Sequence, residues 1–220
     1  MRLPDFDMGG NVGTFAAVFL GALLATVGGV AAGQLEAALR RRERERWAAL
    51  LFGEVLSTLE VLLHFAEQTR RVGDPYGPIT LRMLRAARRE IEVYDRNRET
   101  LYELRDGRLR VGVHTLILRL TMPLENLLDT DAMVKHGRAE LKSATLSPAA
   151  RAEGEEELNA LESRRDQGFD FVTETAEELP ELVAALSKIA RHRFARYEGP
   201  GPLPPAAAGV DALGQSPAPG

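Results

Sequence analysis

The sequence predicts an all-α protein: one transmembrane helix near the N-terminus, an antiparallel bundle of about four helices, and a disordered C-terminal tail. Three observations support this prediction. Val12–Ala32 is a run of 21 uncharged residues, and about 20 helical residues cross a bilayer core of about 30 Å. Apolar residues after it recur at helical spacing, and no long stretch alternates with the period of a strand. From Gly199 onward, Pro, Ala and Gly dominate, which is typical of disorder.

Composition excludes several classes of function. The 220 residues include 28 Lys+Arg, 32 Asp+Glu and no cysteine. The chain therefore has no thiol nucleophile, iron–sulfur cluster or cysteine-ligated zinc. Its net charge of -4 gives no overall attraction to nucleic acid. Only Lys135, Lys142 and Lys188 are lysines, a bias typical of high-GC coding that suggests a bacterial origin.

The uncharged run reads as a retained anchor in the bacterial inner membrane. The leader before it carries Asp5 and Asp7, whereas a signal peptide begins with basic residues. Cleavage after Gly29-Val30-Ala31 is the alternative. A basic cluster follows the run, which by the positive-inside rule places the N-terminus outside and everything after Gln34 in the cytoplasm. This cluster, which would also lie near lipid headgroups, consists of Arg40, Arg41, Arg42, Arg44 and Arg46.

Four segments follow from this interpretation: an extracytoplasmic N-terminus (1–11), a transmembrane helix (12–33), a cytoplasmic bundle (34–198) and a disordered tail (199–220). Small residues recur at every fourth position of the transmembrane helix. Such a stripe lets two helix backbones approach closely in lipid, so we expect self-association through it, with a passive anchor as the alternative. Its members are Gly13, Ala17, Gly21, Ala25, Gly29 and Gly33.

The first cytoplasmic helix has an apolar face from Trp47 to Ala66 and follows the membrane helix with no strong breaker before Gly53. Turn-forming residues at 73–78 predict a loop. A second helix is predicted at roughly 80–105, with Thr80 as a candidate cap. A third is predicted at roughly 108–130, and Pro123 should kink it.

Ser147-Pro148 predicts the start of a fourth helix that reaches toward Tyr197, because Ser favours the N-cap and Pro the first helical position. Pro180 predicts a kink or a short break, with Thr175 and Glu178 as a capping box for the restart. The segment 151–181 has 11 acidic and 3 basic residues, and 82–110 has 9 arginines and 6 acids. We therefore expect the acidic fourth helix to lie beside the arginine-rich second helix.

The sequence does not indicate an enzyme, a cofactor or a metal site. Phosphate-binding glycine loops and the serine elbow of hydrolases are both absent from it. Glu60, His64 and Glu67 could share a metal at helical spacing, but they lie opposite the apolar face and should point to water. His136 and Glu140 have the same spacing, with His136 in an expected loop. His114 should lie at the boundary of the third helix's apolar face.

Arg82, Arg85 and Arg89 share one face of the second helix. A solvated or acid-paired face is the main interpretation, and contact with lipid headgroups is the alternative. Nucleic-acid binding is not expected, because few aromatic or base-reading side chains accompany them.

Taken together, these patterns predict a single-pass, membrane-anchored scaffold that forms homo-oligomers and presents its cytoplasmic bundle to an unidentified protein partner. A membrane effector that forms a small oligomeric pore or perturbs the bilayer is the first alternative. A metal-dependent enzyme within the bundle is the second.

Overall fold

The computed structural model describes residues 8–72, 74–143 and 146–195, with side chains for 19–72, 74–142 and 146–195, and all regular structure in this part of the chain is helical. The predicted leader (1–7) and tail (199–220) lie outside the described residues. The all-α prediction is confirmed, with five α-helices packed together where about four were expected. They are α1 (Met8–Arg71), α2 (Pro78–Arg96), α3 (Gly107–Ser143), α4 (Pro148–Ala176) and α5 (Leu179–Ala190), with a 3-10 helix, η1 (Arg98–Glu103), between α2 and α3.

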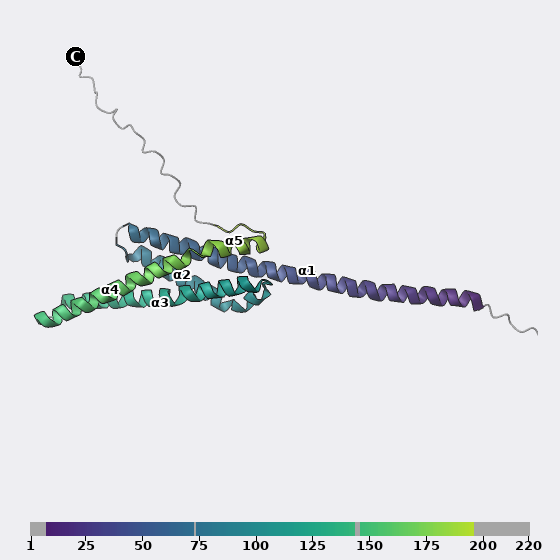
Figure 1. The fold of residues 1–220 in the computed structure, drawn as a ribbon, viewed down its shortest axis with the longest axis horizontal. Coiled ribbons are helices and arrows are strands. Elements are labelled where there is room, and N and C mark those ends of the chain that lie inside the picture. The colour runs from purple at the N-terminus through teal and green to yellow at the C-terminus, as the bar shows by residue number, and fades with distance from the viewer. Residues whose placement is uncertain (1–7, 73, 144–145, 196–220) are drawn as a thin grey trace, which may run out of the picture.

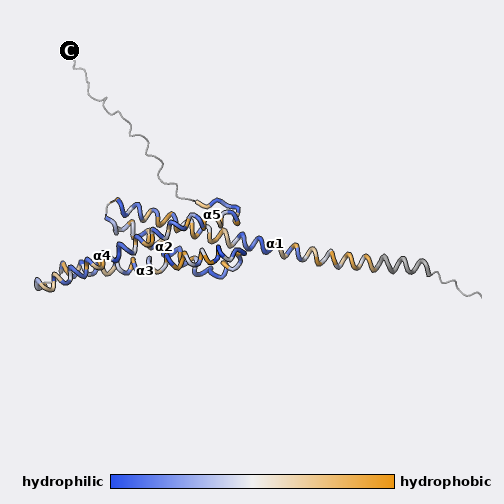
Figure 2. Tube along the Cα trace, viewed as in Figure 1, coloured by the Kyte–Doolittle hydropathy of each residue, from blue (hydrophilic) through white to orange (hydrophobic). Residues whose placement is uncertain are grey.

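Helix α1 runs without a break from the predicted membrane segment into the bundle. Its 64 residues correspond to about 96 Å at 1.5 Å per residue. The N-terminal half projects from the bundle as a single helix (Figure 1). This projecting half is mostly apolar, and a hydrophilic band marks the place where α1 enters the bundle (Figure 2).

One hydrophobic core joins the helices of the bundle. Phe52 and Leu56 of α1 lie in it beside Leu84 of α2, Leu120 of α3 and Leu186 of α5, all fully buried. The apolar spacing seen in the sequence therefore points each helix toward a common interior. The periodicity that predicted a bundle is confirmed.

The second predicted helix is two elements, α2 and η1, which meet at Asn97. Helix α2 begins at Pro78 with Gly77 as its N-cap, so the prediction of Thr80 as the cap is wrong. Thr80 is instead buried, and its hydroxyl donates a hydrogen bond of 3.0 Å to the hydroxyl of Thr69 on α1. The turn at Asp74–Gly77 falls within the predicted loop.

Helix α3 is longer than the sequence predicted, because it continues through Pro123 to Ser143. His136 therefore lies in a helix, and its assignment to a loop is wrong. The break between the second and third predicted helices is confirmed, and Asp106 caps the helix that follows it. Its Oδ1 accepts hydrogen bonds from the backbone amides of Arg108 (2.8 Å) and Leu109 (3.2 Å).

The fourth predicted helix is divided into α4 and α5. Ser147 caps α4 as predicted, since its hydroxyl accepts a hydrogen bond of 3.3 Å from the amide of Ala150. The break falls just before Pro180, at Glu177 and Glu178. Glu178 is the N-cap of α5 and makes no side-chain capping bond, and the Thr175 hydroxyl is buried without a partner. The predicted capping box is therefore wrong.

The packing order also corrects the expected charge pairing. Helix α1 packs mainly against α2 and α5, while α4 packs mainly against α3. The arginine-rich α2 therefore does not lie against the acidic α4, because apolar burial determines which helices meet. Arg88 of α2 pairs with Glu125 of α3 at 2.6 Å. Helices α3 and α4 extend together past the bundle, at the end away from the projecting half of α1 (Figure 1).

Candidate functional site

The predicted association stripe lies on the projecting half of α1. Gly13 and Ala17 fall where side chains are not described, while Gly21, Ala25, Gly29 and Gly33 are exposed. A Cβ atom added at Gly21, Gly28, Gly29 or Gly33 would meet nothing within 4 Å. Bulky side chains of this segment are equally uncovered, with Phe19 at 73% exposure. An apolar helix of this length therefore has no packing partner within the described chain.

The basic cluster lies between the projecting half of α1 and the bundle. Arg40 pairs with Glu36 on the same helix at 2.5 Å, and Arg41 and Arg42 are exposed. Arg44 approaches Glu103 of η1 at 3.6 Å. The Arg46 Nε atom donates a hydrogen bond of 2.9 Å to the carbonyl of Ala190 at the end of α5. The last two arginines thus connect α1 to the base of the bundle.

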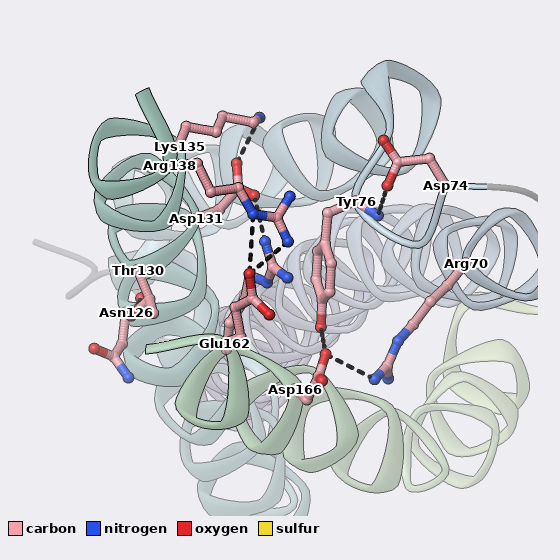
Figure 3. A network of polar contacts seen from close by, with 11 residues as sticks. Arg70, Asp74, Tyr76, Asn126, Thr130, Asp131, Lys135, Arg138, Glu162 and Asp166 are labelled. Atoms are coloured by element: carbon pink, nitrogen blue, oxygen red, sulfur yellow. Dashed lines mark hydrogen bonds and ion pairs between the residues drawn. The ribbon is translucent and has the colours of Figure 1, made fainter. Parts of the chain in front are cut away.

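A polar network that the sequence did not reveal joins four segments at the other end of the bundle (Figure 3). Its centre is Tyr76, from the loop between α1 and α2. The Tyr76 hydroxyl donates a hydrogen bond of 2.5 Å to Asp166 Oδ1 on α4. The Arg165 guanidinium carbon lies 3.6 Å from the centroid of the Tyr76 ring, as a cation–π contact. Arg70 of α1 binds Asp166 at 3.2 Å and Asp170 at 2.6 Å.

The most deeply buried part of this network is an ion pair between α3 and α4. Arg165 Nη1 donates to Asp131 Oδ1 at 3.2 Å, and Lys135 Nζ donates to Asp131 Oδ2 at 2.7 Å. The Arg165 Nε atom is buried without a hydrogen-bond partner. Burial and the hydrogen bond to Asp166 raise the pKa of Tyr76 well above its usual value. The phenol therefore stays protonated and continues to donate to Asp166.

A cleft of about 550 Å³ lies beside this network. Basic and acidic side chains line it in equal numbers, and those named above pair with one another. We call the network of Arg70, Tyr76, Asp131, Arg165 and Asp166 the clasp, because its ion pairs and hydrogen bonds join α3 and α4 to α1. It fixes the outward-reaching parts of α3 and α4 relative to α1.

The residues considered for metal binding fall at separate places. His64 is half-buried, and its Nε2 atom lies 3.1 Å from Gln68 Nε2. Glu60 and Glu67 are also half-buried and line a small pocket with α4 and α5 residues, so the expectation that all three point to water is wrong. The reason is that α1 packs on two sides. Among the described residues, no three His, Asp or Glu side chains are grouped to hold a metal ion.

Two further histidines, His136 and His114, have partners on their own or a neighbouring helix. His136 pairs with Glu140 at 3.2 Å along α3. The His114 Nδ1 atom lies 2.8 Å from the hydroxyl of buried Tyr94 on α2, at the edge of the core. Burial raises the pKa of Tyr94 to about 12. His114 thus occupies the boundary position that its place in the sequence predicted.

The arginine face of α2 remains open. Arg82, Arg85 and Arg89 are exposed and make no ion pair with an acid in the described part of the chain. With Pro78 and Leu128 they line a shallow hollow of about 400 Å³. A solvated face describes these arginines better than an acid-paired one.

A second groove follows the α3–α4 extension. Here the helices approach closely because α4 has a glycine: a Cβ atom on Gly154 would lie 2.9 Å from Leu141 Cδ2. The groove measures about 880 Å³. Its lining is mostly apolar: Ala132, Met133, His136, Gly137, Glu140, Leu141, Leu146, Ala150, Gly154, Glu157, Leu158 and Leu161. It lies at the end of the molecule farthest from the projecting apolar segment (Figure 1).

One sequence signal could have revealed the polar network. Asp131 follows Leu127 by four residues, and Arg165 precedes Phe169 by four, so each charge lies on an apolar helix face. A charged side chain on an apolar helix face is buried when the helix packs, and a buried charge needs a partner.

Comparison with known proteins found no match. No protein-family model matches the chain, and no curated protein or solved structure matches it either.

Proposed function

We propose that this protein is a single-pass, membrane-anchored scaffold that self-associates through the small-residue stripe of α1 and presents its cytoplasmic bundle to protein partners. The observation that carries the proposal is the exposed apolar half of α1. The other half of α1 is packed in the bundle. The exposed half is therefore part of a stable helix, but its apolar side chains have no packing partner in the described chain.

By length and composition alone, α1 is long and apolar enough to cross a membrane. Two apolar stretches contribute to this property, and they differ in surroundings. From Ala48 to Ala66 the core face is covered by the bundle, whereas the side chains from Phe19 to Leu39 stay exposed. A lipid environment stabilises the second stretch, because a helix satisfies all its backbone hydrogen bonds internally. The arginines that follow favour a cytoplasmic bundle.

Self-association is the part of the proposal that the small residues support. Helices in lipid associate by close packing of their backbones, and small side chains at every fourth position permit it. Gly21, Gly29 and Gly33 each have free space around the Cα atom in the single chain. That space is available to a second helix.

Presentation of a partner surface rests on the rod-like arrangement. The anchor lies at one end, the clasp around Tyr76 fixes α3 and α4, and the apolar groove lies at the opposite end (Figure 1). A groove held away from the membrane by a continuous helix is accessible to cytoplasmic proteins.

The test is the native mass of the full-length protein in a mild detergent. Gly29→Leu should reduce the oligomer to smaller species, because the larger side chain separates the helices. Gly28→Leu is the matched control: it lies at the same depth on a different side of α1 and is equally open. An unchanged mass in Gly29→Leu, or a monomeric native protein, contradicts the proposal. A membrane effector would instead arrest growth and admit dye on overexpression, both relieved by Gly29→Leu.

A further inference from the structure

The bundle leaves one side of α1 open. Phe52, Leu56 and Leu59 are fully buried in the core, but the opposite side of the same helix is open. Trp47, the only tryptophan of the chain, is 66% exposed, and Phe65 is 41% exposed. We call this open side the outward face; it comprises Trp47, Leu51, Glu54, Thr58, Val61 and Phe65. Leu51 and Val61 are half-buried there, and Glu54 and Thr58 are exposed.

The outward face is aligned with the C-terminal part of the association stripe. Gly29, Trp47 and Phe65 are successively 18 residues apart, which is about five turns at 3.6 residues per turn. Because α1 is one uninterrupted helix, all three point to the same side. The C-terminal part of the stripe (Ala25, Gly29 and Gly33) and the outward face therefore lie on one side of α1, with Glu36, Arg40 and Glu43 between them.

The spacing within the outward face is that of a helix-pairing seam. Its members are separated alternately by four and three residues, the pattern by which two parallel helices interlock. The seam contains two aromatic and two aliphatic side chains, a composition suited to a buried contact. Neighbouring basic side chains already have acidic partners within the chain: Arg40 pairs with Glu36, and Arg44 approaches Glu103.

We propose that a second copy of this chain packs along the outward face, so that two α1 helices remain paired from the membrane to Phe65. This inference rests on the proposed function, because anchors in one membrane hold both copies parallel and at equal height. A two-fold axis along the membrane normal then brings each residue to its own counterpart. Trp47 meets Trp47 of the other copy, and Phe65 meets Phe65. The binding of a different protein to the outward face would not require this face to be aligned with Gly29.

Glu54 is the unfavourable position in this seam, because the two-fold axis brings like charges together. Glu54→Leu should therefore tighten the dimer of the full-length protein, and we expect roughly a tenfold lower dissociation constant. Phe65→Glu should weaken the dimer by a similar factor. Leu118→Glu is the matched control for Phe65→Glu, since Leu118 is also about half exposed, at 51%, but lies on α3.

Cross-linking tests the contact directly, because the natural chain has no cysteine. Thr58→Cys places one thiol on the outward face with little change in side-chain size. Thr115→Cys is the matched control: it replaces the same residue type, which is likewise exposed but lies on α3, away from the seam. Gly29→Cys and Gly28→Cys report the membrane contact in the same way. Each full-length variant is oxidised mildly in native membranes, and disulfide-linked homodimers are measured.

The proposal predicts homodimers of the Thr58→Cys and Gly29→Cys variants, and few or none of the Thr115→Cys and Gly28→Cys variants. If the Gly29→Cys variant cross-links but the Thr58→Cys variant does not, the outward face is not a self-contact, although the proposed self-association in the membrane stands. If neither cross-links, both proposals are wrong. Equal cross-linking of the Thr58→Cys and Thr115→Cys variants indicates random collision and also overturns this inference.

Discussion

Asp131 and Arg165 form an ion pair of 3.2 Å between α3 and α4, and their side chains are only 3% and 7% exposed. Water therefore contributes little to either charge, so each depends on the other and on nearby groups. Lys135 also binds Asp131, and the ring of Tyr76 covers Arg165. The pair lies where α3 and α4 leave the bundle, so it determines how firmly their extension is held.

Removing one charge of this pair should strongly destabilise the bundle. In Asp131→Asn, Arg165 remains buried without its anion, and breaking such a pair costs about 3–5 kcal/mol. Denaturant unfolding of the full-length protein, followed by circular dichroism, measures the change. Glu162→Gln is the control, because the Arg138–Glu162 pair joins the same two helices at a more exposed place. It should cost about 0–1 kcal/mol, and equal effects in the two variants would contradict this interpretation.

Alkaline pH should destabilise the protein through its buried tyrosines. The pKa of Tyr94 rises from the usual 10.0 to about 12 because burial disfavours the phenolate. Stability from this group is fully present below pH 10 and is lost as pH rises toward 12, since the unfolded chain releases its proton first. The pKa of Tyr76 is raised in the same direction.

The measurement is the free energy of unfolding between pH 9 and pH 11, compared in the natural protein and Tyr94→Phe. The variant should lose less stability across the alkaline part of this range, because one proton is no longer released on unfolding. Parallel pH dependence in the two proteins would show that Tyr94 ionises normally.

Gly53 leaves space for the segment after α5 to pack against α1. A Cβ atom at this position would overlap the ring of Phe194, which is nearly buried against α1. Gly53→Ala should therefore release Phe194, because overpacking costs about 1–3 kcal/mol. The better helix propensity of alanine offsets about 1 kcal/mol of that. Faster hydrogen exchange at the amides of 192–195 is the expected result.

Gly137→Ala is the control for this change. A Cβ atom at Gly137 would lie 3.7 Å from Leu158 Cδ1, an ordinary contact. That variant should be as stable as the natural protein or more stable by up to about 1 kcal/mol. Unchanged exchange at 192–195 in Gly53→Ala would mean that Phe194 does not depend on the glycine.

The sequence predicted what depends on periodicity and on local caps. The apolar spacing around Leu56 and Leu84 identified the core, and Ser147-Pro148 located the start of α4. The sequence-based predictions were wrong where tertiary contacts determine the position of a residue. Thr80 is a buried hydrogen-bond partner of Thr69 and not a cap. Arg88 pairs with Glu125 because apolar burial places α2 beside α3.

The clasp and the outward face required three-dimensional information for a different reason. Tyr76, Asp131 and Arg165 are far apart in sequence and come together only when four segments meet. The outward face could not be predicted, because α1 carries apolar residues on two sides. The sequence predicted one apolar face, whereas in the structure one side of α1 is covered by the bundle and another is open. Only the position of the bundle reveals that Trp47 and Phe65 are exposed.

The membrane anchor is the premise of both proposals, and extraction of membranes with alkaline carbonate tests it. The full-length protein should remain in the membrane pellet after this wash, because apolar contacts of an inserted helix do not depend on surface charge. A variant that combines Leu23→Asp, Leu24→Asp and Val27→Asp should move to the soluble fraction with its helical signal retained. Release of the natural protein by the same wash would show that α1 does not cross the bilayer.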